Sequence, residues 1–193
     1  MPMNKIKNNN EQKAMPWFAF QFMRFVMNIR KNFRNIEEEI NLAGMEKGLR
    51  ILDFGCGLGF NTIPAAKAVG NKGRVFALDL SNQSIKIMKK KIRKNKLNNV
   101  EIIHSGCDTG LEDKSIDLVY LHNTLPIVKE KQKVLGEITR VLKTGGRLSY
   151  MSRVGSRIFG EDTVSNSKLK EILSSDFILK IERKGHLIFE RIS

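Results

Sequence analysis

Short apolar runs alternate with segments of helical periodicity along the chain from residue 49 onward. Apolar runs of strand length predict buried β-strands at residues 50–54, 74–80, 100–105, 116–121 and 146–152. Between them, apolar positions spaced by three and four predict helices at residues 60–69, 86–96, 129–143 and 167–175. Pro64 fits the first of these helices only in its first turn, and Ser81 can cap the second.

The end of the chain departs from this alternation. Residues 177–192 predict two strands joined at Lys184 and Gly185, which is a β-hairpin. Strands that alternate with helices predict βαβ units, and therefore a parallel sheet covered on both faces. A hairpin can only be antiparallel. We therefore expect an α/β fold, a doubly wound, mostly parallel seven-stranded sheet with an antiparallel C-terminal hairpin at its edge.

The front of the chain lies outside the alternation. Residues 1–13 are polar and predict a loose tail. Residues 15–33 place phenylalanine and methionine at helical spacing and predict an amphipathic helix. Residues 35–43 predict a second, short helix that Gly44 ends. This front part is the predicted N-terminal helical extension of the fold.

We expect a single domain over residues 1–193, with residues 1–45 as a tail and helical lid and residues 46–193 as the core. The 15–33 helix has three interpretations: packing on the core, a lid over a substrate pocket, or peripheral contact with a membrane interface. Its glutamine, asparagine and arginine residues argue against a membrane span, which needs about 20 mostly apolar residues. No signal peptide is visible.

The formal net charge of +14 permits a polyanionic partner, such as RNA or an anionic membrane surface, without requiring one. The excess is concentrated in residues 86–96, where the simpler interpretation is a solvated helix face. The two cysteines, Cys56 and Cys107, give neither a disulfide framework nor zinc-ligand spacing, so no metal site is expected. A reducing cytoplasmic location fits this cysteine usage.

Three glycines follow the first predicted strand at every second position, in ILDFGCGLGF (51–60). They are Gly55, Gly57 and Gly59. Glycine adopts positive φ and lets a ligand approach bare backbone. A dinucleotide-binding loop requires its third glycine three positions after the second, and both registers fail, at Phe60 and at Thr62.

The pattern D-x-G-x-G-x-G, from Asp53 to Gly59, resembles motif I of the class I S-adenosylmethionine-dependent methyltransferases. Asp79 supplies the acidic residue expected at the end of the second strand. The resemblance covers residues 45–153, and the ubiquinone/menaquinone-biosynthesis and arsenite methyltransferase types look most similar. It implies a Rossmann-like fold, S-adenosylmethionine as cofactor and S-adenosylhomocysteine as product.

The resemblance also implies cofactor contacts at the ends of the strands. Asp79 would accept hydrogen bonds from the ribose hydroxyls, and Leu80 would pack against the adenine. Asp108, next to Cys107, would contact the adenine amino group, and Asp53 would lie near the methionine end. Each carboxylate has the simpler alternative of capping its own turn. The expected cofactor-binding residues are Asp53, Gly55, Cys56, Gly57, Gly59, Asp79, Leu80, Cys107 and Asp108.

Two further segments resemble the same family: SIDLVYLHNTL (115–125) resembles its motif IV, and EITRVLKTGGRLSY (137–150) resembles its helix, Gly-Gly turn and fifth strand. His122 follows the fourth strand, where a general base could remove an acceptor's proton, because histidine titrates near neutral pH. Asn123 could orient the acceptor there. A purely structural histidine is the alternative at 122.

We therefore expect a methyltransferase acting on a small, apolar or aromatic molecule. Methylation of RNA or protein is the alternative, which the net charge motivates, and a non-enzymatic module that retains the pocket is a third interpretation. Nucleic acid is not favoured, because LHNTLP lacks the N-P-P-Y-like loop of such enzymes. Arsenite is not favoured either, because neither cysteine lies where the acceptor should bind.

Overall fold

The computed structural model describes residues 35–152, 164–183 and 185–193. The amphipathic helix expected at 15–33 lies outside these residues. None of the helices in the described residues has the length and apolar character needed to cross a bilayer.

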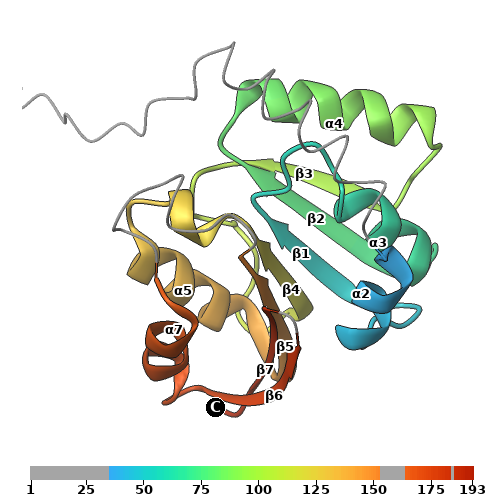
Figure 1. Ribbon diagram of the computed structural model, residues 1–193. Helices are drawn as coiled ribbons and strands as arrows, with labels where there is room; N and C mark the ends of the chain where they lie inside the picture. Colours follow the sequence, from blue (N-terminus) through green and yellow to red (C-terminus); the bar gives the residue numbers. More distant parts are fainter. Residues whose placement is uncertain (1–34, 153–163, 184) are drawn as a thin grey trace, which may run out of the picture.

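One mixed seven-stranded sheet forms the centre of the molecule (Figure 1), as the sequence predicts. Its order is β3-β2-β1-β4-β5-β7-β6. Strands β1 to β5 are parallel, whereas β7 is antiparallel to both β5 and β6. The strands are β1 (Arg50–Phe54), β2 (Arg74–Asp79), β3 (Val100–His104), β4 (Ile116–His122), β5 (Leu142–Met151), β6 (Phe177–Arg183) and β7 (His186–Arg191).

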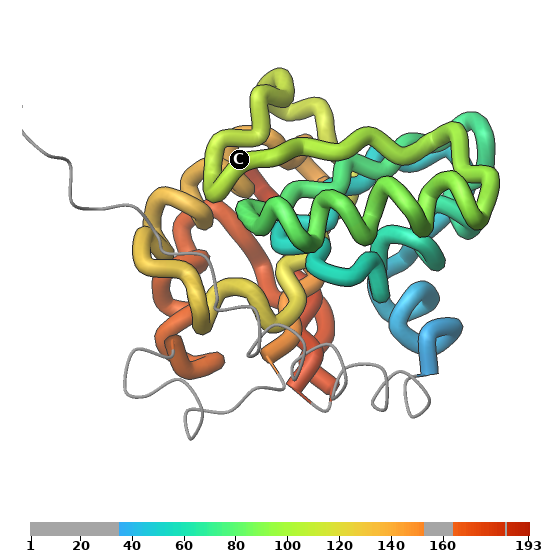
Figure 2. Tube along the Cα trace, turned by 90° about the horizontal axis from the view of Figure 1, so that it is seen from above, coloured from blue at the N-terminus to red at the C-terminus, as the bar shows by residue number. Residues whose placement is uncertain are grey.

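Helices cover both faces of the sheet, because the chain crosses over between successive parallel strands. Helices α2, α3 and α4 lie on one face, and α5 and α7 lie on the other (Figure 1). Seen from above, α4 runs beside β3 (Figure 2). The described helices are α2 (Ile36–Leu42), α3 (Thr62–Val69), α4 (Asn82–Lys94), the 3-10 turn η1 (Leu125–Ile127), α5 (Lys131–Val141) and α7 (Asn166–Leu173).

Local sequence signals set several helix ends. Pro64 lies in the first turn of α3, and the side chain of Ser81 accepts a hydrogen bond from the Ser84 N–H at the start of α4. Gly44, with φ of 63°, follows the end of α2. All three features agree with the sequence predictions.

The fifth strand begins four residues earlier than the predicted 146–152. Residue pairing with β4 shifts from Ile116↔Leu142 to Leu118↔Arg147, so residues 143–146 bulge out within the strand. Gly145 has φ of 78°, which allows this bulge. The glycine pair therefore interrupts a longer strand instead of separating a helix from a strand.

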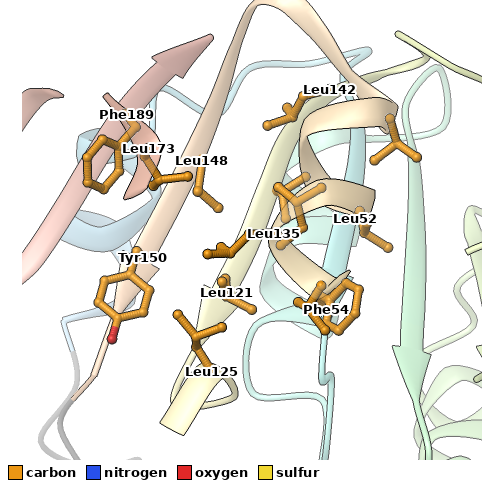
Figure 3. Packing of buried hydrophobic residues seen from close by; sticks show 14 of the residues in the cluster. Leu52, Phe54, Leu121, Leu125, Leu135, Leu142, Leu148, Tyr150, Leu173 and Phe189 are labelled. Atoms are coloured by element: carbon orange, nitrogen blue, oxygen red, sulfur yellow. The ribbon is translucent and has the colours of Figure 1, made fainter. Parts of the chain in front are cut away.

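The larger hydrophobic core lies between the sheet and α5 and α7. Leu52 of β1, Leu121 of β4 and Leu148 of β5 converge beneath Leu135 of α5 (Figure 3). These four side chains are at most 4 % exposed. This packing holds β1 and β4 side by side, and their carboxyl ends carry the candidate site.

Candidate functional site

The strand order of the sheet reverses between β1 and β4, which is its topological switch point. From β1 the sheet continues to β2 and β3 on one side, and from β4 it continues to β5 and the hairpin on the other. In open α/β sheets, ligands bind in the crevice beyond the carboxyl ends of the strands at this switch point. The predicted site residues all follow or end the strands at this edge.

Several N–H groups of the glycine loop after β1 form hydrogen bonds within the protein. The N–H groups of Gly55 and Cys56 both donate to the Leu78 carbonyl of β2, at 2.8 Å. Gly59 donates to the Cys56 carbonyl at 2.8 Å. Lys91 of α4 donates to the Leu58 carbonyl. Because these groups are bonded within the protein, the loop differs from a phosphate-binding nest of outward N–H groups.

The three glycines have different neighbours. All three have positive φ, of 78°, 50° and 75°. A Cβ on Gly55 would lie 2.2 Å from the Thr124 Oγ1, and one on Gly59 would lie 2.9 Å from the Met88 Cε. Among the residues that the structure describes, and apart from its two chain neighbours, the nearest heavy atom to a Cβ on Gly57 would be the Gly55 carbonyl oxygen, at 3.9 Å. Gly57 is therefore the one of the three whose missing side chain leaves open space at the loop.

Asp79 connects this loop to the end of β2. Its Oδ2 accepts the Gly57 N–H at 2.7 Å, and its Oδ1 accepts the Ser81 N–H at 2.8 Å. Each carboxylate oxygen can still accept another hydrogen bond. The next residue, Leu80, is 42 % exposed, while its carbonyl contacts the His104 Nε2 at 3.0 Å. A carboxylate and an apolar side chain thus stand together beside the glycine loop.

Two of the predicted residues lie inside the protein. Asp53 is fully buried and accepts the Thr62 hydroxyl of α3 at 2.6 Å. The Cys56 side chain packs with Ala77 and Met88, and burial raises the pKa of its thiol well above the ordinary value, with Asp53 and Asp79 acting in the same direction. Both side chains shape the loop from within.

The loop after β3 carries Asp108 and Cys107. Asp108 is exposed and accepts the Gly110 N–H at 2.9 Å, while Cys107 is half-buried. Burial raises the pKa of the Cys107 thiol, with Glu137 adding to the shift. A thiol of raised pKa is a poor nucleophile or metal ligand at neutral pH.

Glu137 of α5 anchors this loop, which the sequence did not indicate. Its Oε1 accepts the Thr109 N–H at 3.0 Å and also the Thr109 hydroxyl. Arg140, one turn later, donates to both oxygens of Glu137. The bonds from Arg140, together with those from Thr109, lower the pKa of Glu137 to about 2 despite its partial burial.

The end of β4 closes the site on the other side. His122 is 8 % exposed and its Nε2 lies 2.8 Å from the Ser149 Oγ of β5. Asn123 has φ of 57° and donates its N–H to the Met151 carbonyl. The Thr124 hydroxyl donates to the Phe54 carbonyl at 3.1 Å, which ties this turn to the glycine loop.

The structure thus gathers the predicted residues along one sheet edge. The side chains of Asp79, Leu80 and Asp108 are accessible in different degrees, whereas Asp53 and Cys56 are enclosed. Sequence reasoning missed Thr62, Thr124 and the anchors of the Asp108 loop, because their partners are distant in sequence. In a chain of net charge +14, carboxylates at this edge favour a cationic ligand over an anionic one.

A family model described as a methyltransferase domain matches residues 45–186. A demethylmenaquinone methyltransferase from Listeria monocytogenes is 30 % identical over 156 residues, which cover 80 % of this chain and 66 % of that protein. A demethylmenaquinone methyltransferase from Geobacillus kaustophilus is 32 % identical over 139 residues, covering 72 % of this chain and 59 % of that protein. The chain spans just under two thirds, or less, of the length of these relatives.

Solved structures of methyltransferases are also similar to this chain. A SAM-dependent methyltransferase from Aquifex aeolicus superposes with a TM-score of 0.74 at 26 % identity, covering 85 % of this chain and 93 % of that one. An arsenic (III) S-adenosylmethionine methyltransferase from Chlamydomonas reinhardtii superposes with a TM-score of 0.60 at 22 % identity, covering 78 % and 65 %. The second likeness concerns the fold alone.

The anchor of the Asp108 loop predicts a specific acid sensitivity. The folded state holds the Glu137 pKa at about 2, below its ordinary 4.5, so the bonds stabilise the protein above pH 4.5 and are lost as the pH falls from 4.5 toward 2. We expect Glu137→Gln to lower the free energy of unfolding at pH 7 by about 1–2 kcal/mol and to flatten this acid-dependent loss. Denaturant titrations at several pH values measure both effects.

Glu130→Gln is the matched control at the N-cap of the same helix, because the Glu130 carboxylate is exposed and forms an ion pair with Lys133 that is worth little. An acid-dependent slope that is the same in Glu137→Gln and in the unmodified protein would contradict the assignment.

Proposed function

The chain belongs to the methyltransferase domain family, and we propose that it transfers the methyl group of S-adenosylmethionine to a small, apolar or aromatic acceptor. The observation that carries the proposal is the open space over Gly57, next to the Asp79 carboxylate. The N–H groups of Gly55, Cys56, Gly57 and Gly59 are all bonded within the protein, which suits a ligand without a pyrophosphate. The family match and the Aquifex structure support S-adenosylmethionine as that ligand.

We assign the nucleoside to the β2 and β3 side of the crevice. Asp79 has acceptor capacity left for ribose hydroxyls, and Leu80 offers an exposed apolar side chain for one face of the adenine. Asp108, held by the Thr109–Glu137 bonds of its loop, faces solvent and can accept from the adenine amino group. Asp53 acts on the methionine end only through the loop, because it is fully buried.

When bound, S-adenosylmethionine supplies a methyl group on a sulfonium, which is already a strong electrophile. The chain's own residues then have three tasks: to hold the acceptor in line with the methyl group, to exclude water, and to remove a proton where the acceptor has one. His122 is the last residue of β4 and Asn123 follows it, and these are the residues we propose for proton removal and acceptor orientation.

The proposal of a small apolar acceptor rests on the relatives. Two of them are named as demethylmenaquinone methyltransferases. The pKa of both cysteine thiols is raised, which does not favour thiolate capture of arsenite. The transfer is therefore proposed to an apolar ring compound of the quinol or phenol type.

A second candidate, methylation of RNA, rests on the surface of α4 and the turn after it. The basic residues that are exposed here are Lys86, Lys89, Lys90, Arg93, Lys94 and Lys96. Such a surface would neutralise phosphates and make binding steeply salt-dependent. The sequence of the turn after β4, LHNTLP, lacks the N-P-P-Y-like loop expected of a nucleic-acid enzyme.

A transfer screen tests the function itself. The protein is incubated with methyl-tritiated S-adenosylmethionine and separately with quinols, phenols, amines and bulk RNA. We expect label in the quinol or phenol fraction. Label in RNA alone would replace the proposed acceptor class, and no label in any fraction, without binding of the cofactor, would contradict the enzyme.

Substitution of Gly57 separates ligand contact from backbone strain. Gly57→Ala places a methyl group in the open space, so we expect the affinity for S-adenosylmethionine to fall by about 10-fold or more in calorimetry. Gly145→Ala, at φ of 78° on the opposite edge of the sheet, has the same kind of backbone penalty of about 1 kcal/mol and should leave affinity unchanged. Equal affinities of the two variants would place the ligand elsewhere.

Removal of the Asp79 carboxylate tests the ribose assignment. Asp79→Ala should weaken binding of S-adenosylmethionine by about 1–3 kcal/mol, because charged hydrogen bonds to the ligand and the Gly57 contact are both lost. Asp117→Ala is the control, since Asp117 also accepts a backbone N–H, from Arg50, but at the other edge of the sheet. The assignment fails if Asp79→Ala binds as tightly as the control.

A further inference from the structure

Three polar side chains from separate strands meet at the carboxyl edge of β4. The register places His122 beside Met151 of β5, and Met151 beside His186 of β7. Ser149 lies two residues before Met151 and therefore on the same face of the sheet. Because β7 is antiparallel, its first residue returns to the edge at which β4 and β5 end.

The three side chains form a hydrogen-bonded chain. The Ser149 Oγ lies 2.8 Å from the Nε2 of His122 and 2.7 Å from the Nε2 of His186. The two imidazole rings are perpendicular, with centroids 5.3 Å apart. Exposure is 8 % for His122, 0 % for Ser149 and 4 % for His186. The three hydrogen-bonded side chains are thus enclosed on β5 and β7, and the least buried of them, His122, is the last residue of β4.

Burial of polar side chains costs free energy unless they hydrogen-bond, as these three side chains do with one another. The neighbouring positions on this face are apolar or aromatic, such as Tyr120 and Ile188, so an apolar trio would fit the sheet. A serine hydroxyl has one proton to donate and can accept others. It can therefore link two histidines as donor to one ring and acceptor from the other.

We propose that His122, Ser149 and His186 form a proton relay that serves methyl transfer, and that the acceptor consequently carries an exchangeable O–H or N–H proton. This inference rests on the proposed function. The attacking atom of the acceptor forms a bond to the methyl carbon as the carbon–sulfur bond breaks, and the electron pair of the carbon–sulfur bond goes to sulfur. The proton that the acceptor loses from its O–H or N–H enters the relay at the His122 ring.

The relay then shifts protons along existing hydrogen bonds. His122 passes its Nε2 proton to the Ser149 oxygen, and the hydroxyl proton moves to the Nε2 of His186. One positive charge leaves the sulfonium and one arrives on an imidazolium, so charge is conserved. Moving that charge to the His186 ring separates it from the methyl acceptor, and no oxidant or co-reactant is required.

Several ionisable groups from the packed elements border the relay. Tyr120 of β4 touches His122 edge-on, with ring centroids 4.7 Å apart. Arg183 of β6 is the register partner of His186 and forms an ion pair with Glu38 of α2. Buried groups near Tyr120 are Glu39, which shares a small pocket with it, and Asp53, its register partner on β1.

Histidine ring NMR tests the relay without any ligand. The protein has three histidines, and His104 on β3 serves as the internal control. In ¹⁵N-labelled protein, long-range ¹H–¹⁵N correlations should show His122 and His186 in opposite tautomers that titrate as a coupled pair. In Ser149→Ala the coupling should vanish while the His104 signals stay the same. Identical tautomers in the unmodified protein, or unchanged titrations in Ser149→Ala, would overturn the relay.

The rate of methyl transfer to 1,4-naphthohydroquinone then tests whether the relay serves the reaction. Ser149→Ala and His186→Gln should lower the rate about 10- to 100-fold near neutral pH, and recover as rising pH ionises the hydroquinone. Ser149→Thr keeps the hydroxyl and should retain most of the rate. His186→Gln keeps a hydrogen-bonding partner for Ser149 but has no basic nitrogen to take up the proton. This variant therefore distinguishes a proton relay from a purely structural role.

The possible failures are distinguishable. An equal rate loss at every pH, with S-adenosylhomocysteine affinity unchanged, would assign the three residues a structural role and overturn the relay. Absence of transfer by the unmodified protein to this probe and to the whole acceptor panel would instead overturn the proposed function, and the NMR result would still decide whether the coupled chain exists.

Discussion

The candidate site depends on one carboxylate that holds two turns at once. Asp79 accepts the N–H of Gly57 with one oxygen and the N–H of Ser81 with the other. The first bond fixes the glycine loop after β1, and the second fixes the start of α4. Because both strands end at this edge, a single side chain sets the distance between the loop and the helix that border the crevice.

Steric contacts complete this arrangement. Thr124 fills the space beside Gly55, and Met88 fills the space beside Gly59, so of the three loop glycines Gly57 is the one that faces open space among the described residues. The hydroxyl of Thr124 also bonds to the Phe54 carbonyl, which connects the turn after β4 to the turn after β1. The space over Gly57 therefore lies beside the Asp79 carboxylate, in a loop that Thr124 connects to the turn after β4.

The features of the fold and the site that could be predicted from the sequence are those that depend on residues close together along the chain. The glycine spacing, the place of Asp79 at the end of β2, the C-terminal hairpin and the cap at Ser81 all follow from local pattern. The strand order agrees with the fold expected from the alternation and the family resemblance. The beginning of β5 was not predictable, because the bulge at residues 143–146 depends on pairing with β4.

Contacts between side chains on different strands and helices are the second feature that could not be predicted from the sequence. Ser149, placed two residues before the end of β5, is an unremarkable polar residue until the register sets it between His122 and His186. Glu137 likewise looks like an ordinary polar residue of a helix in the sequence, and only the structure shows that it accepts the Thr109 N–H. The predicted roles of the site residues stay predictions that depend on a ligand.

A crystal structure with S-adenosylhomocysteine bound tests the central claim most directly. The account predicts that the ribose hydroxyls lie within hydrogen-bond distance of the Asp79 carboxylate and that the ligand contacts the Gly57 backbone with no side chain between them. A nucleoside bound at another edge of the sheet, or a crevice closed by protein atoms over Gly57, would contradict it.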